Sequence, residues 1–249
     1  KLCDVDKQFY LDYIDWLRSS CKTAWGKPVS PKTAHSYYTT LRTALNEAVR
    51  ENLIASNPWY RLEMTEKIKV PESKRDFLTI EEIKKMMATP FFNEQVRQAY
   101  LFSCFCGLRI SDIRKLRWRD LSMSGGQWRV SVVMTKTTHP VYIPLSSQAV
   151  KWLPERGDCT HDGLVFGGLP NEGNLCVNLK SWAEKAGVKK NVTFHTARHS
   201  CAVLLLTLGA DIYTVSKILG HRSVRSTQVY AKIVDKKKDD AIALVDNAF

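Results

Sequence analysis

The last quarter of the chain carries side chains whose types and spacing suit chemistry on a phosphate. His195 and Arg198 are three residues apart, so on a helix they share one face and can reach one anion. His221 and then Tyr230 follow in the sequence. Two imidazoles, a guanidinium and a phenol that converge make up the set that covalent attack on a phosphate needs. This segment predicts a nucleophilic site with Tyr230 as the attacking group.

A phosphodiester that is attacked without a metal ion needs its positive charge from the protein. No cluster of acidic residues with the spacing of a two-metal site stands out, so we expect no metal and no other cofactor. Arginine suits this task, because its planar guanidinium matches two phosphate oxygens. Arg198 is one candidate. Arg109 is the other, since it precedes an expected helix start whose backbone N–H groups can lie near the same anion.

Proton transfer needs further groups. A tyrosine has an ordinary pKa near 10, so its phenol is mostly neutral at pH 7 and must lose a proton as it attacks. His195 is suited to accept or relay that proton. Lys136, at the expected tip of a hairpin, can donate a proton to the departing sugar oxygen if neighbouring cations lower its pKa. His221 can hydrogen-bond a phosphate oxygen that gains charge in the transition state.

Each of these residues has an ordinary alternative role when it is taken alone. An H-x-x-R pair is more often a surface or capping feature, and a hairpin lysine is usually solvated. Arg109 alone would pair with Asp112 or Asp120. Tyr230 alone would be a half-buried aromatic residue, and His221 a helix C-terminal residue favoured by the helix dipole. Only the joint pattern, in this order, favours a catalytic site that acts on a phosphate.

The overall charge indicates a polyanionic partner. The chain has 249 residues, enough for two unequal domains, with 37 Lys and Arg against 25 Asp and Glu. Residues 1–75 hold 13 basic and 9 acidic side chains, and the remainder holds 24 and 16. Since the excess is spread over both parts, both can touch a nucleic acid. Charge alone is weak evidence, because many basic proteins bind no nucleic acid.

The seven cysteines favour a reducing compartment. They form no C-x-x-C pair, their number is odd, and several lie in apolar runs, so we expect buried thiols rather than a disulfide frame or a zinc site. No signal peptide is evident, and the longest apolar runs are far too short to span a bilayer. We therefore expect a cytosolic protein with no membrane partner. The cysteines are Cys3, Cys21, Cys104, Cys106, Cys159, Cys176 and Cys201.

The first 70 residues predict a small helical domain. Aromatic and apolar residues at helical spacing predict a helix over 4–20, and Ser30-Pro31 begins a second helix that reaches about Glu51. Three polar residues of this second helix are candidate DNA contacts, with an ordinary solvated face as the alternative. A charged stretch over residues 67–76 predicts an interdomain linker. The three candidate residues are Lys32, His35 and Arg42.

From residue 77 onward the pattern is mainly helical with one hairpin. Thr79 and Glu82 form a capping box, and an apolar helix over about 93–106 is stopped by Gly107. Ser111 can cap a short helix that runs through Leu116. Alternating apolar residues on either side of Lys136 predict a β-hairpin with this lysine at or near its tip. Further helices are expected over about 173–186, 195–208, 211–219 and 223–231, with a final one from about Asp235.

These motifs together resemble the tyrosine recombinase (phage integrase) family. The matching pieces are FCGLRISDIRKLRWRDL, a lysine in MTKTTHPVYIPL, HTARHS and LGHRSVRSTQVY, and ALNEAVRENLIASNPW is similar to the end of the family's helical core-binding domain. The likeness covers essentially the whole chain, and the sequences of these motifs are particularly similar to those of integrases of Bacteroides-type mobile elements. One departure is Ala197, where many members have leucine; a small residue there should be tolerated.

The resemblance implies the fold, the active site and the reaction. The fold would be mainly α with a small antiparallel β-sheet: a helical core-binding domain over 1–70, then an α+β catalytic domain over 77–249. Tyr230 would attack DNA to give a 3′-phosphotyrosine link and a free 5′-OH, and strand exchange would pass through a Holliday junction without ATP or metal. The implied active site is Arg109, Lys136, His195, Arg198, His221 and Tyr230.

The resemblance also implies partners. Family members act on double-stranded recombination sites as tetramers and often exchange C-terminal segments, here residues 235–249, with apolar Ile242, Leu244, Val245 and Phe249. DNA-bending helper proteins and a bacterial, nucleoid-associated location are expected. Many integrases carry a further N-terminal domain that binds arm sites. This chain begins at the core-binding helices, so we expect that domain to be absent or to have been removed.

Three other functions remain as alternatives. A type IB topoisomerase would use the same chemistry as a monomer, without strand exchange between sites. A non-catalytic DNA-binding module, such as a directionality factor or repressor, would bind without cutting, although an intact set of six argues against it. A metal nuclease would need a cation, so cleavage in EDTA would exclude it. The sequence leaves the target sequence and the preference for integration or excision open.

Overall fold

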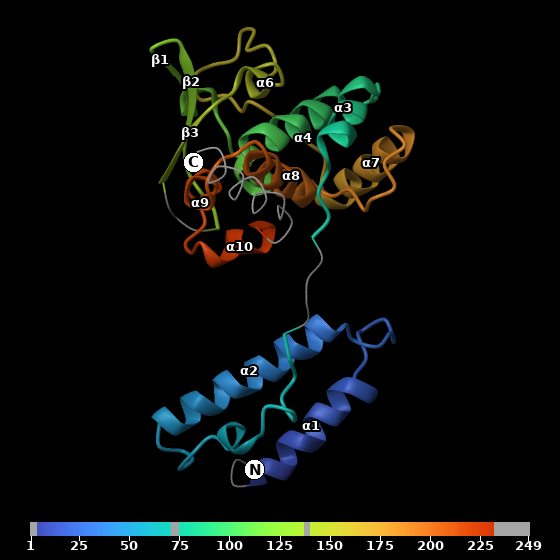
Figure 1. Ribbon diagram of the computed structural model, residues 1–249, viewed down its shortest axis with the longest axis vertical. Helices are drawn as coiled ribbons and strands as arrows, with labels where there is room; N and C mark the ends of the chain where they lie inside the picture. Colours follow the sequence, from blue (N-terminus) through green and yellow to red (C-terminus); the bar gives the residue numbers. More distant parts are fainter. Residues whose placement is uncertain (1–3, 71–74, 137–139, 232–249) are drawn as a thin grey trace, which may run out of the picture. The chain divides into compact units, whose positions relative to one another are not determined.

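The structure is a computed structural model that describes residues 4–70, 75–136 and 140–231. The chain divides into two compact units, residues 1–74 and 75–249, which are described separately (Figure 1). The predicted linker over 67–76 spans this division. The expected fold class is confirmed: the described elements are mostly helices, with one small antiparallel sheet. The functional domain boundaries remain predictions.

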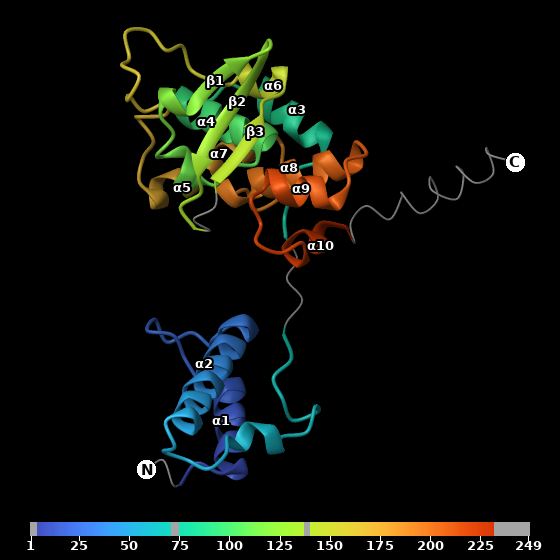
Figure 2. The same ribbon diagram turned by 90° about the vertical axis from the view of Figure 1, so that its left-hand side faces the viewer.

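The N-terminal unit is built from α1 (Lys7–Ser19), α2 (Pro31–Arg50) and the short 3-10 helix η2 (Pro58–Arg61). Each helix begins at a capping side chain: Asp6 accepts from the Phe9 N–H at 2.8 Å, and Ser30 accepts from the Thr33 N–H at 3.1 Å. α1 and α2 pack against each other (Figure 2), and their apolar faces share one core. Its buried members include Tyr10, Ile14, Leu17, Tyr38 and Leu45.

The three candidate DNA contacts differ in their surroundings. Lys32 is exposed, whereas His35 and Arg42 are half-buried. The Arg42 guanidinium lies 4.8 Å from the centroid of the Trp59 ring, so part of its charge already rests on an aromatic face. Contact of these residues with DNA remains a prediction.

The C-terminal unit is centred on two packed helices, α4 (Glu94–Cys106) and α8 (Phe194–Thr207). Both carry buried apolar residues on most of their faces, which is typical of central helices. α10 packs against α8 and α9 (Figure 1). The other helical elements are α3 (Ile80–Ala88), α5 (Ile110–Ile113), η3 (Trp118–Asp120), α6 (Ser147–Val150), α7 (Glu172–Lys185), α9 (Ile212–Ile218) and α10 (Arg225–Ala231).

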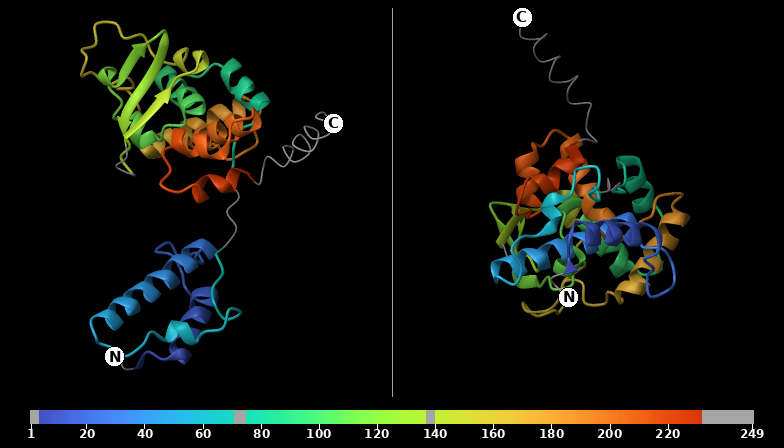
Figure 3. Two further views of the ribbon diagram at one scale, coloured as in Figure 1. Left: turned by 60° about the vertical axis from the view of Figure 1, so that its left-hand side comes forward. Right: turned by 90° about the horizontal axis from the view of Figure 1, so that it is seen from below.

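The sheet has the strand order β1-β2-β3, with β1 (Leu121–Ser124), β2 (Gln127–Val133) and β3 (Pro140–Pro144) all antiparallel. The three strands lie side by side (Figures 2 and 3). Val130 pairs with Ile143, and both side chains enter the same core as residues of α4. The predicted hairpin is thus present as β2 and β3. β1 was not predicted, because its four residues show no clear alternation.

The start of α5 differs from the sequence prediction. Ser111 was expected to cap this helix, but the N-cap residue is Arg109, and no side chain makes the capping hydrogen bond. The helix also ends at Ile113 rather than at Leu116. The Arg109 side chain is engaged elsewhere, so only the backbone at this position begins the helix.

One other expectation is met only in part, and a second is not tested. Cys21, Cys104, Cys106 and Cys201 are buried free thiols, but Cys159 is exposed, and Cys3 lies outside the described residues. The predicted helix from Asp235 also lies outside them. Within the described part of the chain, no helix is both long and apolar enough to cross a membrane.

Candidate active site

Arg198 ties together the segments that carry two other predicted site residues. Its guanidinium donates to the carbonyl oxygen of Gly107 at 2.8 Å and to that of Leu219 at 2.5 Å. Gly107 is two residues before Arg109, and Leu219 is two residues before His221. The end of α4 and the end of α9 are therefore held on one buried cation, which is 4% exposed.

Two glycines permit this close approach. Gly107 ends α4 with a φ of 74°, and a Cβ there would lie 2.7 Å from Leu219 Cδ2. Gly220 follows α9 with a φ of 60°, and a Cβ there would lie 2.8 Å from Met134 Sδ. A larger residue at Gly107 would press on α9, and one at Gly220 would press on the side chains beside the sheet. A positive φ also favours glycine at both positions. Both glycines thus bring the sheet and two helix ends to the site.

Arg109 reaches the sheet from the start of α5. Its Nη1 lies 2.9 Å from Met134 Sδ, the residue just after β2, and 4.0 Å from Asp112 Oδ2. Asp112 also accepts a hydrogen bond from the Thr135 N–H at 2.9 Å through its other oxygen. The buried Asp112 carboxylate therefore links Arg109 to the backbone beside Lys136. Asp112 is one of the two ion-pair partners that the sequence offered for Arg109, and the pair is long, at 4.0 Å and without a hydrogen bond.

Lys136 and His195 lie at the open side of this cluster. Lys136 is exposed in the turn that follows β2, and His195 is exposed in the first turn of α8. Loss of hydration on the protein side of the ring comes first in lowering the pKa of His195, followed by the positive charges of Arg198, Lys136 and Arg109. The charges of three other predicted site residues therefore reach the His195 ring.

His221 is held neutral at the end of α9. Its Nδ1 is 2.8 Å from Thr227 Oγ1 on α10. Burial lowers the pKa of His221 to about 4, and the charges of Arg198 and Arg109 add to this effect. At pH 7 the ring is therefore uncharged, so it can offer one N–H to a phosphate oxygen without repelling the arginines. Burial, again with the charge of Arg109, lowers the pKa of Arg198 to about 10, which still leaves it protonated.

Tyr230 lies beside the cluster but bonds to residues outside the predicted six. Its side chain is 1% exposed. The phenol oxygen is 2.5 Å from His199 Nδ1 and accepts from Arg75 Nη1 at 3.1 Å. Among the residues that the structure describes, no hydrogen bond joins Tyr230 to the other five predicted site residues. His199 and Arg75 are therefore the polar partners of the expected nucleophile.

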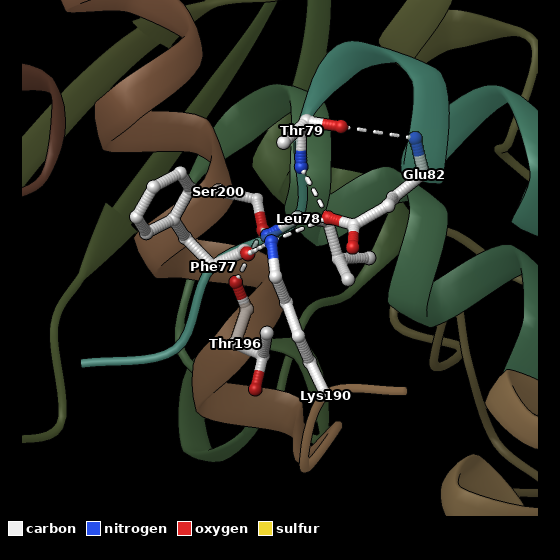
Figure 4. A network of polar contacts seen from close by, with 7 residues as sticks. All are labelled: Phe77, Leu78, Thr79, Glu82, Lys190, Thr196 and Ser200. Carbon is white, nitrogen blue, oxygen red and sulfur yellow. Dashed lines mark hydrogen bonds and ion pairs between the residues drawn. The ribbon is translucent and has the colours of Figure 1, made fainter. Parts of the chain in front are cut away.

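A polar network fixes the segment after Arg75 on α8 (Figure 4). The Leu78 N–H donates to Ser200 Oγ at 2.7 Å, and this hydroxyl donates to the Thr196 carbonyl oxygen at 2.7 Å. Lys190 Nζ donates to the Phe77 carbonyl oxygen at 2.8 Å and to Glu82 at 2.6 Å. Because Ser200 follows His199 directly, this network holds the start of the unit next to the partners of Tyr230.

Sequence reasoning missed His199 and Arg75. His199 had a usable signal, since it stands four residues after His195 and therefore near the same helix face. The two rings are 6.3 Å apart and nearly parallel. Arg75 had none, because it lies 155 residues from Tyr230 within a stretch that reads as a charged linker. Asp112 was named only as an alternative ion-pair partner of Arg109.

Family models match both units. Residues 76–237 match the phage integrase family, and residues 1–70 match the phage integrase SAM-like domain.

The chain belongs to the phage integrase family.

Relatives support this membership along most of the chain. A tyrosine recombinase of Thermosipho africanus is 30% identical over 232 residues, which cover 87% of this chain and 77% of the relative. The tyrosine recombinase XerD of Pseudomonas putida is 26% identical over 93% of this chain and 79% of its own. The chain is thus a tyrosine site-specific recombinase.

Solved structures share the fold. XerH recombinase bound to a palindromic difH substrate, in a post-cleavage complex, matches with a TM-score of 0.73 at 18% identity, over 99% of this chain and 74% of that one. The Tn1549 transposon integrase in complex with circular intermediate DNA matches with a TM-score of 0.68 at 17% identity, over 92% and 82% of the two chains. At such identities the likeness concerns the fold alone.

The two half-buried histidines, His199 and His221, should make this recombinase sensitive to acid. Burial lowers the pKa of both His199 and His221 to about 4, from an ordinary value of 6.5. Between these values the unfolded chain binds more protons than the folded one, so the free energy of unfolding should fall as pH drops from 6.5 towards 4. Urea unfolding at pH 7 and pH 5 would measure the loss. The His221→Asn variant should lose less stability over this interval, and an equal loss would contradict the assignment.

Proposed function

We propose that this recombinase cuts and rejoins DNA through a 3′-phosphotyrosine formed by Tyr230, with strand exchange through a Holliday junction. The observation that carries the proposal is the position of Arg198, which joins the segments bearing Arg109 and His221 into one cationic site beside a buried phenol. Such a site matches an anionic phosphate, and the phenol is a nucleophile that can later leave.

The six residues have different roles in the proposed reaction. Arg109 and Arg198 bind the two non-bridging oxygens of the scissile phosphate, and neutral His221 donates a hydrogen bond to one of them. Lys136, in the exposed turn after β2, protonates the departing 5′-oxygen, and His195 assists proton movement at the open side. The ester to Tyr230 stores the energy of the broken bond, so rejoining needs neither ATP nor a metal ion.

The DNA contacts extend over both units. The excess of basic residues in each unit supports contact with the phosphates of duplex recombination sites, which should make affinity fall steeply with salt. Lys32, His35 and Arg42 on α2 are the proposed contacts of the N-terminal unit, and their joint replacement by alanine would measure that contribution. We further propose a cytoplasmic protein of a bacterial mobile element, similar to Bacteroides-type integrases and assisted by DNA-bending proteins.

The active assembly is proposed to be a tetramer that exchanges its C-terminal segments. An apolar groove of about 310 Å³ runs between α3, α4, α6 and α8. Its lining includes Ile83, Met87, Phe105 and Leu204. The apolar residues of segment 235–249 need a surface to bury, and this groove in a neighbouring copy is the proposed acceptor.

A two-site assay tests recombination against the alternatives. The protein is incubated in EDTA with the junction sequence of its element, first as a suicide substrate and then as paired sites on two duplexes. We expect a denaturation-resistant protein–DNA adduct, recombinant duplexes and a complex of four protomers in native gels. An adduct with plasmid relaxation but no recombinants would favour a type IB topoisomerase. Binding without an adduct would favour a non-catalytic module, and cleavage that EDTA abolishes would favour a metal nuclease.

A further inference from the structure

The hydrogen bonds of Tyr230 can be assigned by counting donors and acceptors. The phenol oxygen is buried and has two described partners, Arg75 Nη1 and His199 Nδ1. A guanidinium only donates, so the phenol hydrogen has no use in the contact with Arg75. If His199 Nδ1 also donated, that hydrogen would be left without an acceptor in a buried place, which costs free energy. The phenol therefore donates to Nδ1 of a neutral His199.

The surroundings of His199 keep it in this form. Burial, then the charges of Arg75, His195 and Arg198, lower the pKa of His199 to about 4. The ring is 5.5 Å from the Tyr230 ring between centroids, and 6.3 Å from that of His195. An anionic phosphate bound by Arg198 would offset the charge of that arginine, and the pKa of His199 would then rise when DNA is present.

The location of His199 also distinguishes it from His195 and His221 as a partner of Tyr230. His199 follows Arg198 directly on α8, and the charge of that guanidinium reaches its ring. His195 is exposed, and His221 is bonded to Thr227 instead. Within the described part of the chain, His199 is the imidazole that contacts the Tyr230 oxygen. The network around Ser200 holds this part of α8 against the segment of Arg75 (Figure 4).

We propose that His199 is a further catalytic residue, which accepts the phenolic proton of Tyr230 during attack on DNA. This inference rests on the proposed function. As the Tyr230 oxygen bonds to phosphorus, its O–H bond breaks and the proton moves to His199 Nδ1. The bond from phosphorus to the 5′-oxygen breaks, and Lys136 supplies the proton to that oxygen. Rejoining runs in reverse: the 5′-OH returns its proton to Lys136, and His199 returns its own to the phenol.

The first test replaces His199 by asparagine. The amide oxygen of asparagine can lie close to the position of Nδ1 and accept the hydrogen bond, but it is not basic. We expect single-turnover cleavage of a suicide substrate to slow by about 10²- to 10⁴-fold, the usual contribution of proton transfer by a side chain. The exposed His161→Asn is the matched control and should cleave like the wild type. If His199→Asn does not fold, His199→Gln takes its place.

Two substitutions of atoms distinguish proton transfer from a structural role. Fluorinated tyrosine at position 230 has a more acidic phenol, so it should reduce the defect of His199→Asn at least tenfold. A sulfur in place of the bridging 5′-oxygen of DNA needs no proton to leave. It should restore cleavage by Lys136→Ala and leave the defect of His199→Asn in place. If His199 had only a structural role, the two experiments would not give this pair of results.

The outcomes separate this inference from the proposed function. A wild-type protein that forms no adduct on its own junction sequence would overturn both. If the wild type forms the adduct, unchanged or faster cleavage by His199→Asn would overturn the inference alone, and faster cleavage would make His199 a contact that holds the tyrosine back. A defect that fluorinated tyrosine does not reduce would also overturn it.

Discussion

Replacing Tyr230 by phenylalanine is expected to abolish covalent attachment of the protein to DNA. The hydroxyl is the proposed nucleophile, and no water or neighbouring side chain can replace its bond to phosphorus in a stable adduct. Loss of a nucleophile lowers activity by on the order of 10⁴-fold or more. The variant should still fold, because it removes only the hydrogen bonds to His199 and Arg75, for about 1 kcal/mol each.

The measurement compares adduct formation and DNA affinity in the same samples. A suicide substrate in EDTA should give a denaturation-resistant band with the wild type and none with Tyr230→Phe, while a gel-shift assay should show similar binding. Tyr213→Phe is the matched control, since this tyrosine is 65% exposed on α9. An adduct of undiminished yield with Tyr230→Phe would refute the assignment of the nucleophile.

Replacing Arg198 by lysine is expected to slow cleavage by about 10²- to 10³-fold, the effect of losing one preorganised charged donor. Lysine keeps the charge, but its donors radiate from a single nitrogen, so it does not reproduce the planar fork that spans the Gly107 and Leu219 carbonyl oxygens. The approach of Arg109 and His221 should therefore loosen. The protein should also lose stability, by about 1–3 kcal/mol for each buried carbonyl left without a donor.

The control for this variant is Arg97→Lys. Arg97 on α4 donates to the Met87 carbonyl oxygen at 2.8 Å and pairs with Glu94, away from the six predicted residues. It should lose stability with little loss of cleavage, measured well below the unfolding temperature of each variant. If Arg198→Lys cleaves like Arg97→Lys, the effect of Arg198 is on folding, and its proposed role at the phosphate is wrong.

Local signals in the sequence determined most of the helices and the hairpin. Asp6 and Ser30 cap α1 and α2, Gly107 ends α4, and the alternation around Val130 and Ile143 marks β2 and β3. These features depend on residues within a few positions of one another, so their periodicity and capping chemistry are visible in the sequence. Ser111 misled the prediction, because a hydroxyl near a helix start is only one of several ways to begin it.

The residue types of the candidate site were also readable. His195 and Arg198 share a helix. The order of Arg109, Lys136, His221 and Tyr230 along the chain indicates the family without any knowledge of tertiary contacts. The sequence thus determined which groups are present and what chemistry they suit.

Only the tertiary structure decided how these groups meet. Arg198 bonds to carbonyl oxygens that lie 91 and 21 residues away, and Arg75 meets Tyr230 across 155 residues. Such contacts depend on where distant backbone segments pack, and the local periodicity of the sequence does not predict them. The pairing of Tyr230 with His199 has the same origin, because α10 must fold back on α8 before this hydrogen bond can form.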